Sequence, residues 1–99
     1  RSRAGPRDAM TLTRSLEIVN ARGLHARASA RFVETVERHD ASASVSRDGM
    51  TVAGDSIMGL LMLAAARGSE IVVSTEGPEA EALMEALTDL VGARFGEDA

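Results

Sequence analysis

The sequence predicts a two-layer α+β domain with the element order β-α-β-β-α-β-α. Three observations carry this prediction. Four short segments alternate between apolar and polar residues as half-buried strands do, three others repeat apolar residues with helical spacing, and Asp48-Gly49 is a strong signal for a two-residue hairpin turn. Because alternating strands bury one face of a sheet, the helices are expected to cover that face.

The first strand and the first helix are joined by a turn that ends in Gly23. Residues 11–19 alternate as a strand, and residues 20–23 form the turn. Residues 26–38 have helical spacing, and His25 takes the N-cap position in place of an ordinary Ser, Thr or Asp cap. The predicted core stripe of this helix is Ala26, Ala30, Val33 and Val36 or Glu37, with Phe32 at its flank, and Arg27, Arg31, Glu34 and Arg38 face outward.

The second half of the chain repeats the alternation of strands and helices. Residues 41–47 and 50–53 are two strands of a hairpin, and residues 70–76 are a fourth strand. Between them, Gly54-Asp55-Ser56 opens a helix over residues 57–66 that is apolar almost all round. The third helix is predicted to begin at Gly77-Pro78, with Glu79 and Glu81 at its positive end, and its stripe is Ala80, Leu83, Met84, Leu87, Leu90 and Val91.

These elements define one domain over residues 10–92. Residues 1–9 have no apolar period and are interpreted as a disordered tail or an expression remnant, and residues 93–99 as a C-terminal tail. Periodicity leaves two topologies open, a ferredoxin-like split βαβ with an added helix and an open-faced β-sandwich.

Composition narrows the range of functions. The absence of cysteine excludes disulfides, thiol catalysis and zinc–thiolate sites, and two histidines without such partners argue against a metal site, so no cofactor is predicted. The net charge of −4 and only two aromatic residues argue against nucleic-acid binding. No apolar run approaches the roughly 20 residues of a membrane span, so we expect a cytoplasmic protein, and we expect it to be a monomer.

The charges are unevenly distributed. Residues 14–38 carry five arginines against three glutamates, a local charge of +2, and residues 70–99 carry eight acids against Arg94 alone. Either this asymmetry is ordinary solvated surface, or the basic half attracts a phosphate or an acidic partner. The second interpretation gains weight at His25, because free backbone N–H groups at a helix start bind anions and a neutral imidazole is a good nucleophile.

Two motifs resemble those of one family. Gly23-Leu24-His25-Ala26-Arg27 resembles the signature of the HPr phosphocarriers of the bacterial phosphotransferase system, and residues 55–60 (Asp-Ser-Ile-Met-Gly-Leu) resemble their regulatory-serine motif. The resemblance covers residues 10 to about 92. It implies an HPr-like open-faced β-sandwich, in which three helices cover one face of a four-stranded antiparallel sheet.

The resemblance also implies a function. His25 would accept a phosphoryl group on Nδ1 from phosphoenolpyruvate through Enzyme I and pass it to an Enzyme IIA, as a stoichiometric carrier and not as an enzyme. Arg27 would contact the phosphate, together with Arg22 and the backbone N–H groups of Ala26, Arg27 and Ala28. Ser56 would be modified by a serine kinase or phosphorylase, although by default it is a helix cap. The expected docking surface for partners consists of Ile57, Met58 and Leu60.

Two residues depart from the family pattern. Ala28 stands where the family usually has proline, and Arg22 stands where a small polar residue is common. Both departures favour the nitrogen-related branch of the family. The alternative function is a small-molecule-binding regulatory domain on a ferredoxin-like fold, in which His25 has no chemical role.

Overall fold

The structure is a computed structural model that describes residues 11–99. Residues 1–9, predicted to be a tail, lie outside the described residues. The elements are β1 (Thr11–Glu17), α1 (Ala26–Glu37), β2 (Ser42–Arg47), β3 (Met50–Ala53), α2 (Ile57–Met62), β4 (Glu70–Glu76), α3 (Ala80–Gly92) and a short 3-10 helix, η2 (Arg94–Gly96). The predicted element order is confirmed.

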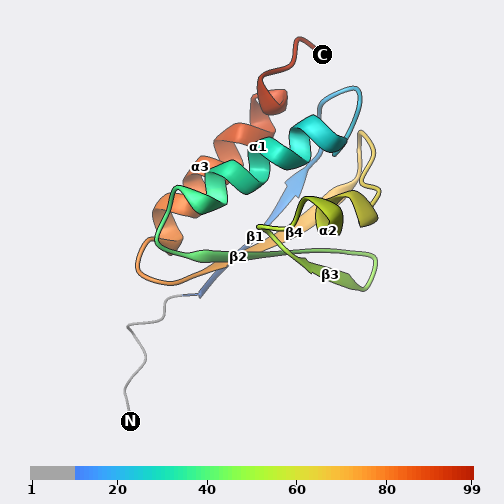
Figure 1. The fold of residues 1–99 in the computed structure, drawn as a ribbon. Helices are drawn as coiled ribbons and strands as arrows, with labels where there is room; N and C mark the ends of the chain where they lie inside the picture. The colour runs from blue at the N-terminus through green and yellow to red at the C-terminus, as the bar shows by residue number, and fades with distance from the viewer. Residues whose placement is uncertain (1–10) are drawn as a thin grey trace.

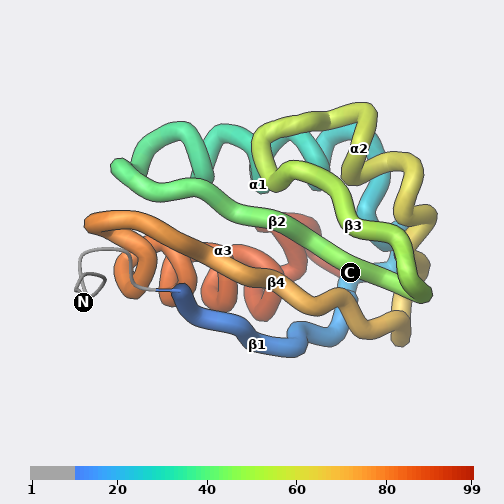
Figure 2. Tube along the Cα trace, turned by 90° about the horizontal axis from the view of Figure 1, so that it is seen from below, coloured from blue at the N-terminus to red at the C-terminus, as the bar shows by residue number. Residues whose placement is uncertain are grey.

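The four strands form one antiparallel sheet in the order β1-β4-β2-β3. Figures 1 and 2 show the helices gathered on one face of this sheet, while the other face is open. Because β1 lies at an edge of the sheet, the ferredoxin-like alternative, in which the first strand is internal, is wrong. The open-faced β-sandwich is confirmed.

The hairpin between β2 and β3 forms where the sequence predicts it. Asp48 and Gly49 both have positive φ angles, 51° and 84°, which is the backbone conformation that a type I′ turn requires at its two central residues. This turn sets Arg47 opposite Met50 in the ladder.

The core lies between the sheet and the helices, and the buried face of α1 differs in part from the one predicted. Val33 and Val36 are buried, as predicted. Ala26 is exposed and Ala30 is only half-buried, whereas Ala28 and Phe32 are fully buried. Alanine fits either environment, so a stripe read from alanines does not define a face. Phe32 does define it, because burial of so large a side chain stabilises the fold by about 1.5–3 kcal/mol.

Two helix boundaries also differ from the prediction. Helix α2 ends at Met62 and not at Ala66, since Ala64 has a left-handed backbone (φ 51°) and Arg47 Nη1 donates to the Leu63 carbonyl at 3.0 Å. Helix α3 begins at Ala80 and not at Pro78. The Glu79 carboxylate accepts a hydrogen bond from the Asp40 backbone N–H at 2.6 Å, which ties this helix start to the end of the α1–β2 connection.

The packed part of the chain continues past residue 92, where the sequence predicts a tail to begin. Residues 94–96 form η2, and the Phe95 side chain is fully buried in the core. Both views show the C-terminal segment returning to the turn that follows β1 (Figures 1 and 2). None of the helices in residues 11–99 has both the length and the apolar character needed to cross a bilayer.

Gly23 and Gly68 offer a matched pair for testing how tightly the turn before α1 is packed. Both have positive φ angles, but a Cβ on Gly23 would lie 2.6 Å from the Ala65 carbonyl oxygen, while a Cβ on Gly68 would meet nothing within 4 Å. Gly68→Ala should lower the free energy of unfolding by about 1 kcal/mol, and Gly23→Ala by about 1–3 kcal/mol more. Urea unfolding measures the free energy of unfolding of both variants. Equal decreases in Gly23→Ala and Gly68→Ala would contradict the close packing of Gly23.

Candidate functional site

His25 caps helix α1 with its imidazole. Its backbone is extended (φ −80°, ψ −176°), and its Nδ1 accepts a hydrogen bond from the Arg27 backbone N–H at 3.3 Å. The predicted N-cap position is confirmed. The ring nitrogen that accepts this bond therefore points toward the first N–H groups of the helix, where the helix dipole and the unpaired donors favour negative charge.

The turn before His25 is fixed by hydrogen bonds to its backbone. The Leu24 N–H donates to the Ala65 carbonyl at 2.9 Å, which attaches the turn to the segment after α2. The buried Asn20 side chain donates to the Gly23 carbonyl at 2.8 Å. These bonds hold the backbone on both sides of Gly23, and the position of His25 follows from them.

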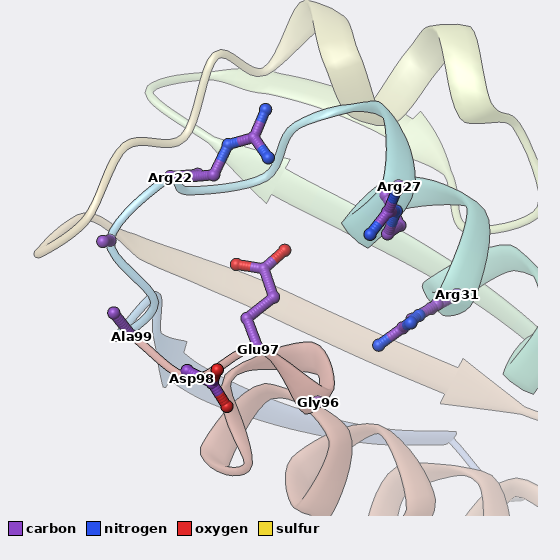
Figure 3. Close-up of a pocket in the computed structure, with 8 residues that line it drawn as sticks. Arg22, Arg27, Arg31, Gly96, Glu97, Asp98 and Ala99 are labelled. Atoms are coloured by element: carbon purple, nitrogen blue, oxygen red, sulfur yellow. The ribbon is translucent and has the colours of Figure 1, made fainter.

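Three arginines line a pocket of about 370 Å³ beside this helix start. Arg22 comes from the turn, and Arg27 and Arg31 lie one helical turn apart on α1; Figure 3 shows all three around Glu97. Arg27 is exposed, as predicted, but Arg31 is half-buried and donates to the Phe95 carbonyl. The pocket thus brings together three of the arginines of the predicted basic half, but it also contains the acidic residues Glu97 and Asp98, which the sequence assigned to a tail.

A left-handed turn in η2 brings these acidic residues to the site. Arg94, Phe95 and Gly96 have φ angles of 58°, 56° and 81°. For a residue other than glycine this conformation costs on the order of 1–3 kcal/mol. Burial of the Phe95 side chain, which stabilises by about 1.5–3 kcal/mol, offsets much of the cost.

Glu97 contacts the second ring nitrogen of His25. Its Oε2 pairs with His25 Nε2, and its Oε1 accepts a hydrogen bond from Asn20 Nδ2 at 3.0 Å. The Asn20 bond is the largest influence on the carboxyl and lowers its pKa; burial opposes this, and the His25 contact and the Arg22 charge lower the pKa further. Because the net effect is a lowered pKa, Glu97 is a carboxylate at neutral pH.

Sequence reasoning missed both Asn20 and Glu97 as site residues. It assigned Asn20 to the turn alone and Glu97 to the tail. The one available signal is Gly96, since a glycine directly before an acidic residue allows the chain to reverse, and it has a φ of 81°.

The second motif lies at the start of α2. Ser56 caps this helix, and its Oγ accepts the Gly59 N–H at 2.9 Å. Ile57 and Met58 are exposed (40% and 69%), but Leu60 is fully buried, so Leu60 cannot form part of a docking surface. Met62, which also belongs to α2, is 63% exposed. Ile57, Met58 and Met62 are called the exposed α2 surface below.

Helices α1 and α2 pack against each other, and the Leu24–Ala65 hydrogen bond joins the His25 turn to the segment after α2. The two motifs thus belong to neighbouring parts of one surface. Among residues 11–99 there is no group of three or more His, Cys, Asp or Glu side chains placed to hold a metal ion.

Comparison with known proteins identifies the family. The family model described as the HPr component phosphorylation site of the phosphotransferase system matches residues 12–93. The chain belongs to the HPr family. HPr proteins are phosphocarriers of the phosphotransferase system, relay proteins rather than enzymes, and the family implies Enzyme I and an Enzyme IIA as partners.

Relatives from both branches of this family are similar to the chain. The HPr of Neisseria meningitidis serogroup A is 46% identical over 86 residues, which span 87% of this chain and 97% of that protein. The NPr of Klebsiella oxytoca is 36% identical over 90 residues, covering 90% of this chain and all of that protein. A crystal structure of an HPr from Thermoanaerobacter tengcongensis superposes with a TM-score of 0.84 at 36% identity, over 89% of this chain and 99% of that one.

The lowered pKa of Glu97 predicts a pH-dependent contribution to stability. Because the folded-state pKa is depressed, the contribution is complete above the ordinary glutamate value of about 4.3 and is lost as the pH falls through the folded-state value. The groups that act on the pKa of the carboxyl are Asn20, His25 and Arg22, and Arg27 and Arg31 line the same pocket. Urea unfolding of the wild type and Glu97→Gln should show a difference in stability that shrinks in acid. A difference that stays constant with pH would contradict the assignment.

Proposed function

We propose that His25 is the residue that carries the phosphoryl group in this HPr protein. The observation that supports this most directly is the orientation of its ring: Nδ1 accepts the Arg27 N–H at 3.3 Å and so has its lone pair at the positive end of α1. In the transfer, a bond forms between Nδ1 and the phosphorus of phosphorylated Enzyme I. The bond from phosphorus to Enzyme I breaks, and its electron pair stays with Enzyme I.

The surroundings of His25 suit a group that must later be released. Ala26, Arg27 and Ala28 form the first turn of α1, so their N–H groups have no acceptor inside the helix, and the Arg27 N–H donates to His25 Nδ1. We expect these N–H groups and the exposed Arg27 guanidinium to contact a phosphate on Nδ1. Each exposed interaction of this kind contributes about 0.3–1 kcal/mol. We assign Arg22 a weaker, long-range role toward the phosphate, because its charge already acts on Glu97.

The exposed α2 surface is the proposed docking site for Enzyme I and an Enzyme IIA. Two of its three side chains are methionines, whose flexibility allows them to fit different surfaces. A carrier that binds more than one protein needs such a surface. A monomer located in the cytoplasm remains the prediction. The nitrogen-related branch also remains a prediction, based on Ala28 and Arg22.

Incubation with phosphoenolpyruvate and a cognate Enzyme I should add one phosphate to the protein, measured as intact mass. The phosphate should be labile in acid and stable in alkali, because it is bound to nitrogen. His25→Ala should abolish the added mass, and His39→Ala, which removes the other histidine, should leave it unchanged. Labelling of His25→Ala would contradict the proposal.

We also propose that phosphorylation of Ser56 regulates the carrier. A phosphate on Ser56 adds a charge of about −1.5 to −2 beside the exposed α2 surface. Burying that charge against the apolar surface of a partner is costly. At the same time, the start of α2 tolerates it, since the Ser56 oxygen already accepts a backbone N–H.

Ser56→Asp should therefore slow phosphorylation of His25 by about tenfold or more while leaving the melting temperature nearly unchanged. Ser15→Asp is the matched control, because it adds the same charge on β1, at the sheet edge opposite β3, and should transfer at the wild-type rate. Stopped reactions with Enzyme I, resolved by intact mass, give the rates. Equal rates of His25 phosphorylation in Ser56→Asp and Ser15→Asp would mean that Ser56 serves only as a helix cap.

A further inference from the structure

The contacts of the two histidines place the ring proton on opposite nitrogens. His39 Nδ1 lies 2.8 Å from the Thr35 carbonyl oxygen, which only accepts, so its Nδ1–H donates. In His25, Nδ1 accepts a backbone N–H from Arg27, and Nε2 faces the Glu97 carboxylate. Both contacts of His25 require the ring proton on Nε2.

Both oxygens of the Glu97 carboxylate are engaged. One faces His25 Nε2, and the other accepts from Asn20 Nδ2, whose side chain is fully buried and also donates to the Gly23 carbonyl. The carboxylate is therefore linked through Asn20 to the same turn that positions His25. It is also anchored from its own side, by the buried Phe95 two residues before it.

We infer that Glu97 is a positioning residue for phosphoryl transfer: its carboxylate keeps the ring proton of His25 on Nε2 and so leaves Nδ1 without a proton. The Nδ1 lone pair then accepts only the long, 3.3 Å bond from the Arg27 N–H, which the phosphoryl group replaces. This inference rests on the proposed role of His25. Glu97 lies outside residues 12–93, the range that matches the family model. The role is thus assigned from the contacts of this chain.

The inferred role is consistent with the balance of protons and charge on the ring during the transfer. When Nδ1 bonds to phosphorus, its lone pair is used and the ring gains a positive charge, while the proton stays on Nε2. The adjacent carboxylate neutralises that charge, so no proton has to leave. When the phosphoryl group moves on, the electron pair returns to Nδ1 and the ring is neutral again.

A blocking role for Glu97 makes a different prediction. If the carboxylate only obstructed the site, it would slow transfer, and Glu97→Ala would transfer faster than the wild type.

Glu97→Gln is the sharpest test because glutamine has the same shape but only one accepting oxygen. Asn20 Nδ2 needs that oxygen, so the amide NH₂ of the variant would face His25 Nε2 and favour the proton on Nδ1. Glu97→Ala removes the contact without reversing it. If Glu97 acted only by filling space, alanine would be the more harmful change. The inferred role predicts the opposite order.

The measurement is the rate of transfer from phosphorylated Enzyme I, with Glu81→Gln as the matched control. Glu81 is exposed in the first turn of α3 and does not line the pocket, so its variant makes the same chemical change while the contact between Glu97 and His25 stays. We expect a loss of about tenfold for Glu97→Gln and about threefold for Glu97→Ala, with Glu81→Gln near the wild-type rate. Glu97→Asp, which keeps the carboxylate, should recover part of the rate lost in Glu97→Ala.

Nitrogen-15 shifts of the imidazole rings, recorded at about pH 9 where histidine is neutral, report the proton position independently of any transfer. His39 serves as the Nδ1–H reference in the same spectrum. In the wild type the ring proton of His25 should lie on Nε2, and in Glu97→Gln this proton should move toward Nδ1. Transfer by Glu97→Gln that is as fast as transfer by Glu97→Ala or faster, or unchanged His25 shifts in Glu97→Gln, would overturn the inference. A wild type that takes up no phosphate would instead overturn the proposed function, while the shifts would still show where the ring proton lies.

Discussion

The capping of α1 by an imidazole is the interaction on which the site depends. An ordinary Ser or Asp cap would satisfy the same helix start with an oxygen, but a ring nitrogen does so while remaining a nucleophile. Such a cap works only if the turn before it is fixed. The hydrogen bond from Leu24 to Ala65 and the close approach of Gly23 to Ala65 supply that constraint, and they also join the turn to the segment after α2.

The charges around His25 are nearly balanced, which suits a relay. Arg22, Arg27 and Arg31 face a pocket that also contains Glu97 and Asp98, and Arg31 is already engaged by the Phe95 carbonyl. A wholly basic pocket would bind the phosphoryl group tightly and release it slowly. Here the acidic residues come from the C-terminal segment, so the electrostatic character of the site is set jointly by the two ends of the described chain.

Helix α2 shows how one short apolar segment serves both the core and the surface. Its six residues leave room for little more than one buried face, and Leu60 occupies it. Leu61 is half-buried, and Ile57, Met58 and Met62 stay exposed. The helix ends at Met62, and the chain continues through the left-handed Ala64. An exposed apolar surface costs solubility, and its position near the His25 turn is what supports the proposed role in partner docking.

The sequence by itself determined the order of elements, the hairpin at Asp48-Gly49, and His25 and Ser56 as helix caps, because these depend on local periodicity and on residues with few allowed conformations. Only the tertiary structure decided that Ala28 and Phe32, and not Ala26, complete the buried face of α1, since alanine fits either environment and packing alone places it. It also decided that Leu60 lies inside and that α3 begins at Ala80. Above all, it placed Glu97 on His25. The two residues are 72 positions apart in the chain, and no local pattern shows that burial of Phe95 and the left-handed turn beside it bring them together.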